Sequence, residues 1–254
     1  MAEHAPGDFC WVDLSAHDYD GARAFYEAVF GWTLANPPGG GGPRYGMFSA
    51  DDEVVAGMGE VPPEMRGHFP SVWNNYVRTE DVRATVARGT ELGARVIFDA
   101  YETPSGTGTL AYLADPSGAI FGLWEPAAHT GAARMGEPGS ACWQELGTRE
   151  VEKATAFYEA LFGWTIQPST APGVEAFLAN GDKMIGHVLR LNEAWGDHPP
   201  RWMPYFAVED ADATCRSVQA AGGAVVVAAT DITAGRFALV RDVQGAHSYV
   251  IRLA

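Results

Sequence analysis

Apolar side chains repeat along the chain with two periods, in an order that recurs. Residues 9 to 15 alternate between apolar and polar, which predicts a strand with one buried face. A helix is predicted next, because Asp18 or Asp20 is a suitable N-terminal cap and Gly31 a suitable C-terminal stop. Its apolar residues lie at helical spacing: Ala22, Phe25, Tyr26, Val29 and Phe30. About three further strands are predicted up to residue 62.

This order of strand, helix and strands defines a module, and it is predicted four times. The modules cover residues 8 to 62, 70 to 126, 141 to 192 and 201 to 254. Residues 127 to 140 are rich in Pro, Gly and Ala, so they are expected to link two halves. We therefore predict an N-terminal domain over residues 1 to 126 and a C-terminal domain over residues 141 to 254.

A repeat within the sequence supports this division. The stretch from Cys10 to Leu34 recurs as Cys142 to Ile166, with an offset of 132 residues. Both copies contain the series Phe-Tyr-Glu-Ala followed by Phe-Gly-Trp-Thr. A unit of this length is too large for a solenoid repeat, so each copy should be a domain with its own core.

Composition narrows the class of protein. The chain has 254 residues, of which 47% are hydrophobic and 19% charged, as in globular proteins. A formal net charge of −15 disfavours nucleic-acid binding, because phosphate recognition needs clustered Lys and Arg. The sequence has no stretch of roughly 18 apolar residues and no pattern of a secretion signal at its start, so we expect a cytoplasmic protein without a membrane partner. The three cysteines have no metal-binding spacing and are expected to be buried thiols.

Three features carry a resemblance to a known family: the repeated series, the capped helix before it and the later turn Asp115-Pro116-Ser117-Gly118. By these features the chain resembles the vicinal oxygen chelate superfamily, also called the glyoxalase, bleomycin-resistance and extradiol dioxygenase superfamily. The resemblance covers nearly the whole chain and is greatest to the tandem two-domain type of actinobacteria. It implies an α+β fold with two tandem domains. Each domain would be a pair of βαβββ modules that form an open, eight-stranded, barrel-like sheet around a pocket.

The resemblance also implies where a metal would bind. Metal-using members hold a divalent ion through His, Glu or Gln on the first and last strands of the modules. Here those positions fall on Trp11, Asn74, Gly122, Trp143, Met203 and Tyr249. Because a divalent ion needs three or four N, O or S donors at fixed geometry, we expect no metal at this position and no other cofactor.

Two carboxylates are candidates for acid or base catalysis. Side chains two apart on a strand face the same way, so Asp13 and Glu145 should share a pocket face with the neighbouring tryptophans. Desolvation among aromatic side chains disfavours a carboxylate's charge, as in a general acid or base. The alternative is that each only binds a neighbouring strand or an arginine such as Arg44 or Arg149.

His187 is the third candidate catalytic residue. It lies at the last strand of the third module, aligned with Met58 in the first, and should reach the same pocket as Glu145. A histidine there could move a proton or bind a metal, and the alternative is an ordinary structural histidine.

Aromatic side chains dominate the expected pocket lining. The predicted ligand-binding residues are Trp11, Asn74, Tyr76, Trp124, Trp143, Met203, Tyr205, His247 and Tyr249. A largely apolar lining with a few polar groups suits a flat, aromatic or polycyclic molecule, although each aromatic side chain could instead fill the core.

These observations give three hypotheses for function. The first is a metal-independent protein that binds or sequesters an aromatic or polyketide-like molecule. The second is a natural-product tailoring enzyme, such as a lyase, isomerase, cyclase or hydroxylase-like protein, that uses a pocket carboxylate or histidine as acid or base. A metal-dependent glyoxalase or dioxygenase is the least favoured. We expect a monomer with its halves packed together, because a tandem duplication joins in one chain what shorter relatives assemble as dimers.

Overall fold

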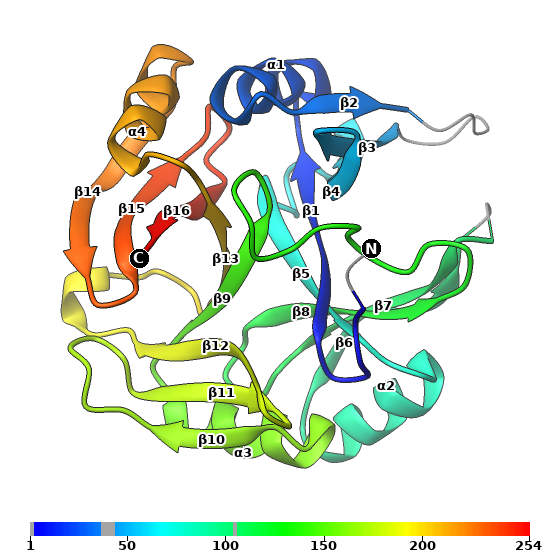
Figure 1. Ribbon diagram of the computed structural model, residues 1–254. Coiled ribbons are helices and arrows are strands. Elements are labelled where there is room, and N and C mark those ends of the chain that lie inside the picture. Colours follow the sequence, from blue (N-terminus) through cyan, green and yellow to red (C-terminus); the bar gives the residue numbers. More distant parts are fainter. Residues whose placement is uncertain (1–2, 37–43, 104–105) are drawn as a thin grey trace.

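The protein folds into two mixed sheets with the same strand order, β2-β3-β4-β1-β5-β8-β7-β6 and β10-β11-β12-β9-β13-β16-β15-β14 (Figure 1). The computed structural model describes residues 3–36, 44–103 and 106–254. These sheets and their four helices confirm the predicted α+β fold of tandem domains.

Each half of the chain forms one sheet. The N-terminal elements are β1 (Phe9–Ala16), α1 (Tyr19–Phe30), β2 (Thr33–Ala35), β3 (Tyr45–Ala50), β4 (Glu53–Glu60), β5 (Val72–Arg78), α2 (Val82–Glu91), β6 (Arg95–Glu102), β7 (Gly108–Ala114) and β8 (Ile120–Pro126). The C-terminal elements are β9 (Ala141–Thr148), α3 (Val151–Phe162), β10 (Thr165–Pro168), β11 (Ala176–Asn180), β12 (Lys183–Arg190), β13 (Arg201–Ala207), α4 (Ala211–Ala220), β14 (Ala224–Ile232), β15 (Gly235–Arg241) and β16 (His247–Leu253). Short 3-10 turns occur at Pro63–Met65 and Glu193–Trp195.

The helices begin and end at local signals in the sequence. The side chain of Asp18, not that of Asp20, caps α1 by accepting a hydrogen bond from the backbone N–H of Gly21. Gly31 ends the helix in the left-handed conformation, at φ 69°, where a residue without Cβ has no steric cost. Asp81 and Asp210 cap α2 and α4 in the same way as Asp18 caps α1. In the described part of the chain, no helix has the length and apolar character needed to cross a membrane.

The main hydrophobic cores cross between the halves. One core combines α1 and its strands with α4 and strands of the C-terminal sheet, and includes Leu14, Trp73 and Phe206. The second core combines α2 with α3, and includes Phe121 and Trp202. Figure 1 shows the same pairing, with α1 beside α4 and α2 beside α3. The face of each sheet turned away from these cores is called its inner face below.

The repeated Phe-Tyr pair links the two halves. The hydroxyl of Tyr158 on α3 donates a hydrogen bond to Asp115 in the turn before β8 (2.9 Å) and accepts one from Nε1 of Trp202 (2.7 Å). Tyr26 on α1 donates in the same way to Asp242, in the turn before β16 (3.0 Å). The tyrosine of each repeat therefore binds the last turn of the opposite sheet.

Candidate functional site

The inner face of the N-terminal sheet holds a buried carboxylate in a cage of donors. Asp13 on β1, of which 6% is exposed, accepts hydrogen bonds from Asn74 (2.8 Å), Tyr76 (2.9 Å) and Tyr45 (3.1 Å). Nε1 of Trp11 donates in turn to the hydroxyl of Tyr45 (3.1 Å). We call this group, with Tyr112, the N-terminal cup.

Burial shifts the pKa values of Asp13 and of two tyrosines in the N-terminal cup. Loss of hydration raises the pKa of Asp13, and the hydrogen bonds from Asn74, Tyr76 and Tyr45 oppose that rise only in part. The pKa values of both tyrosines are raised well above their ordinary value, first by burial and then by the Asp13 charge. Both phenols therefore keep their protons and act as donors.

The C-terminal sheet carries a matching group around Glu145 on β9. Only 2% of Glu145 is exposed, and it accepts hydrogen bonds from Tyr205 (2.9 Å) and Tyr249 (2.8 Å). Nε2 of His187 lies 3.0 Å from the same carboxylate, and Nδ1 lies 2.7 Å from Nε1 of Trp143. We call these residues, with Met203, the C-terminal cup.

The tautomer of His187 follows from its partners. The indole Nε1–H of Trp143 is only a donor, so Nδ1 of His187 must accept and carries no proton. Nε2 therefore carries the proton and donates a hydrogen bond to Glu145. In this arrangement His187 has one N–H, and the carboxylate of Glu145 accepts three hydrogen bonds.

The two cups reach the same geometry with different residues. In strand register, Asp13 pairs with Gly57 and Glu145 pairs with His187, so the counterpart of His187 is Gly57 and the expected Met58 is wrong by one residue. A Cβ at Gly57 would overlap the hydroxyl of Tyr45. Tyr45 thus reaches across the glycine from β3 and stands in for the histidine, accepting from a tryptophan and donating to the carboxylate.

A second exchange of this kind occurs on the closing strand. Tyr249 of β16 occupies the position of Gly122 in β8, since each pairs with the tyrosine of the strand beside it, Tyr205 or Tyr76. A side chain at Gly122 would overlap Tyr76, and the hydroxyl of Tyr112 on β7 instead hydrogen-bonds Tyr76. Sequence reasoning missed Tyr45 and Tyr112, and the signal available was a glycine on each neighbouring strand.

The remaining predicted residues lie around the cups. Trp124 belongs to the cluster of Trp11 and Tyr76, and its Nε1 donates to the backbone oxygen of His129 (2.9 Å). Met203 packs with Tyr205 and Tyr249. His247 lies at the rim of the C-terminal cup, with its ring 6.1 Å from that of His198.

The two arginines considered as carboxylate partners bind elsewhere. Arg44 forms ion pairs with Asp20 (2.9 Å) and Glu60 (3.0 Å). Arg149 donates to backbone oxygens of the loop between β12 and β13. Hydrogen bonds to phenols, an amide and an imidazole, and not these arginines, hold the two carboxylates.

Different segments cover the two cups. The segment that joins the halves lies on the N-terminal cup, where the ring of His129 is 4.5 Å from Trp11. It is fixed there because the backbone N–H of Ala132 donates to Cys10 (2.9 Å) and that of Ala133 to Val54 (2.8 Å). The C-terminal cup instead meets the loop of residues 191–200, from which Trp195 packs against its aromatic residues.

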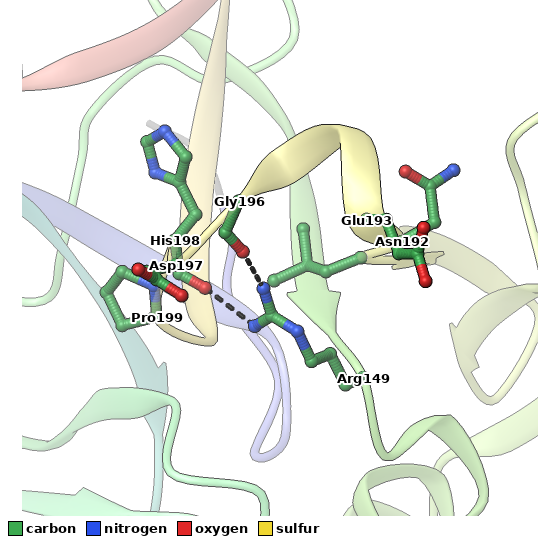
Figure 2. Close-up of a pocket in the computed structure, with 8 residues that line it drawn as sticks. Arg149, Asn192, Glu193, Gly196, Asp197, His198 and Pro199 are labelled. Carbon is green, nitrogen blue, oxygen red and sulfur yellow. Dashed lines mark hydrogen bonds between the residues drawn. The ribbon is translucent and has the colours of Figure 1, made fainter.

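A cavity of about 590 Å³ lies beside this loop (Figure 2). It is lined by Arg149, Leu191, Asn192, Glu193, Gly196, Asp197, His198 and Pro199. Figure 2 shows Arg149 donating to the backbone oxygens of Gly196 and His198, which holds the loop in place. The residues that line this cavity include none of the predicted site residues, but Arg201, which follows the loop, contacts Nδ1 of His198 (3.0 Å).

A model of the Glyoxalase/Bleomycin resistance protein/Dioxygenase superfamily matches residues 9–123 and 142–247. The chain belongs to this superfamily. The protein CFP32 of Mycobacterium tuberculosis, which carries the provisional name glyoxylase, is 36% identical over 100% of this chain and 97% of its own. The anthracycline biosynthesis protein DnrV of Streptomyces peucetius is 33% identical over 100% of this chain and 96% of its own.

Solved structures of the superfamily share the fold. The Mn(II)-bound glyoxalase from Novosphingobium aromaticivorans superposes with a TM-score of 0.68 at 17% identity, over 97% of this chain and 82% of that one. The 2,3-dioxygenase LapB from Pseudomonas sp. KL28 gives a TM-score of 0.67 at 12% identity, over 99% and 93% of the two chains. At these identities the likeness concerns the fold alone.

The donors in the two cups do not fit the divalent ion that some superfamily members hold. Across residues 3–36, 44–103 and 106–254, no three or more His, Cys, Asp or Glu side chains gather as a metal-binding group. In the C-terminal cup, protein donors already occupy both oxygens of Glu145 and the free lone pair of His187. A metal on His187 would have to displace the hydrogen bond from Trp143, and a metal on Glu145 would have to displace donors that the carboxylate already binds or share its oxygens with them.

Proposed function

We propose that this protein binds a small aromatic, polyketide-like molecule at the C-terminal cup without a metal. The observation that carries the proposal is the hydrogen-bonded group of Glu145, His187, Tyr205 and Tyr249 on the inner face of the sheet. Aromatic rings and a few fixed polar groups are the usual composition of a small-molecule site. The rings of Tyr205 and Tyr249 are almost fully buried and stack on each other at 4.1 Å, so they form a flat apolar floor beneath the polar groups of the cup.

The C-terminal half is favoured over the N-terminal half because of what covers each cup. The N-terminal cup is covered by the segment that joins the halves, which backbone hydrogen bonds from Ala132 and Ala133 fix in place. Tyrosine side chains also fill the space beside Gly57 and Gly122 in this cup. The C-terminal cup instead meets the loop of residues 191–200, which also lines an open pocket of about 590 Å³.

The relatives support an aromatic ligand. DnrV and DauV, each 33% identical to this chain, are named as anthracycline biosynthesis proteins, and anthracyclines are aromatic polyketides. Their matches extend over the whole of this chain, so both cups are included.

A tailoring enzyme is the second candidate, favoured by one observation. The chain of hydrogen bonds from Trp143 through His187 to Glu145 holds a buried carboxylate in a fixed position, as suits a general acid or base. Glu145 would then take a proton from the bound molecule or return one, with His187 and the two tyrosines orienting its carboxylate. Asp13 is the corresponding candidate in the N-terminal cup.

Calorimetric titration with an anthraquinone carboxylate, before and after treatment with EDTA, tests the proposal. We expect saturable binding that EDTA leaves unchanged, and recovery of the ligand unaltered. Glu145→Gln should weaken binding, while Asp13→Asn, the matched change in the N-terminal cup, should not. Absence of binding, or binding that appears only after Mn(II) is added, would contradict the proposal, and conversion of the ligand would favour the enzyme.

A further inference from the structure

Three nitrogen-bearing side chains gather between the cavity and the C-terminal cup. Arg201 begins β13, and its Nη2 lies 3.0 Å from Nδ1 of His198 in the loop. The rings of His198 and His247 are 6.1 Å apart. Residues two apart share a strand face, so Arg201 lies on the side of Tyr205 and His247 on the side of Tyr249. His198 also lines the cavity.

Arg201 is partly buried and has no carboxylate partner among the described residues. In the part of the chain that the structure describes, Arg201 forms no ion pair with Asp or Glu within 4.0 Å. Burial lowers its pKa, and electrostatic attraction from Tyr249 and Glu145 opposes this only in part. Among the described residues, the hydrogen bonding of Arg201 involves only Nη2, which contacts His198, so most of its five N–H groups remain available.

His247 adds a second unused polar atom. Its Nδ1 is buried and has no partner of good hydrogen-bond geometry among the described residues, although the backbone of Gly245 lies near the ring. Burial, and then the charge of Arg201, lower the pKa of His247 to about 4, an effect that the nearby backbone of Gly245 offsets only in part. The imidazole is therefore neutral at neutral pH, where it has one N–H to donate to an acceptor.

We propose that Arg201, with His198 and His247, forms a subsite for the carboxylate of an aromatic acid. A guanidinium presents a planar fork that matches a carboxylate, and such paired, charge-assisted hydrogen bonds are among the strongest in proteins. Of the three side chains, His198 also lines the pocket beside the loop, which gives an acid group a route to Arg201 from that side. This inference rests on the proposed function and assigns the chemical class of its ligand.

The test compares an anthraquinone carboxylate with the corresponding carboxamide, which has the same shape and no charge. Wild-type protein should bind the carboxylate about tenfold to a hundredfold more tightly. Arg201→Gln should abolish this preference and leave the affinity for the carboxamide within about threefold. Arg216→Gln is the matched control, because Arg216 is exposed on α4, and it should keep the wild-type preference.

The outcomes separate this inference from the proposed function. Equal affinities of wild-type protein for the two probes would overturn the subsite, and this comparison needs no variant that must fold. A preference that survives Arg201→Gln would also overturn it. If both probes bind equally, the proposed function stands without the subsite, whereas if neither binds, the proposed function fails and the subsite fails with it.

Discussion

Replacing Tyr158 with Phe should destabilise the protein strongly, although only one oxygen atom is removed. That hydroxyl accepts a hydrogen bond from Trp202 and donates one to Asp115, and both partners are almost fully buried, with 2% and 3% exposed. A buried polar group that loses its partner costs about 1–3 kcal/mol. With two groups affected, Tyr158→Phe should lower the free energy of unfolding by about 2–6 kcal/mol.

The loss of unfolding free energy in Tyr158→Phe should also depend on pH. Burial raises the pKa of Asp115 above 3.8 in the folded protein, so the stability that its protonated form contributes is lost as the pH rises through the folded value. The hydrogen bond from Tyr158 lowers that pKa, and its removal should raise the pKa further. The destabilisation should therefore be greater at about pH 7 than at about pH 4.

Equilibrium unfolding in urea, followed by circular dichroism at both pH values, measures these effects. Tyr101→Phe is the control, because Tyr101 is 44% exposed, and it should change the free energy of unfolding by less than about 0.5 kcal/mol. The hydrogen-bond reasoning would be refuted if Tyr158→Phe changed the free energy of unfolding as little as Tyr101→Phe does. It would also be refuted if Tyr158→Phe lowered that free energy equally at both pH values.

Four further predictions concern the cups. Glu145→Gln should weaken binding of an anthraquinone carboxamide by about tenfold or more in calorimetry, and Asp13→Asn by less than about twofold, so similar losses would contradict the choice of cup. The same titration should give one ligand per chain, and two would show that the N-terminal cup also binds. Trp143→Phe should release His187 from its single tautomer, seen as altered imidazole ¹⁵N shifts in NMR; unchanged shifts would refute the assigned tautomer. Burial raises the pKa of Cys10 to about 12, so this thiol should resist alkylation in the native protein at about pH 8. Rapid labelling of Cys10 would contradict the covering of the N-terminal cup.

Much of the fold could be predicted because its signals are local. The cap at Asp18 and the left-handed Gly31 define α1 within a few residues of sequence. The repeat of the Phe-Tyr series predicted a second domain of the same kind, and the family match over both halves bears this out. Even so, the reason for the repeated tyrosine was not visible, since Tyr158 meets Asp115 only after two sheets pack together.

The candidate site was predictable in part for the same physical reason. Alternation along β1 and β9 placed Asp13 and Glu145 on an inner face, because that period depends on the strand alone. The register between strands does not depend on one strand alone. The residue of the first module that corresponds to His187 was therefore misplaced by one position, at Met58 and not Gly57. Tyr45 went unnoticed because its role depends on Gly57 of the adjacent strand.

The sequence by itself determined the elements, their order, the duplication and the side of each strand that carries polar groups. These follow from chain geometry and from the free energy of burying apolar side chains, which act over a few residues. The tertiary structure alone decided which donors surround Glu145, which segment covers each cup, and that Arg201 has no carboxylate partner among the described residues. Hydrogen bonds and charges act over a few ångströms in space, and contacts between distant parts of the chain arise only when the sheets close on one another.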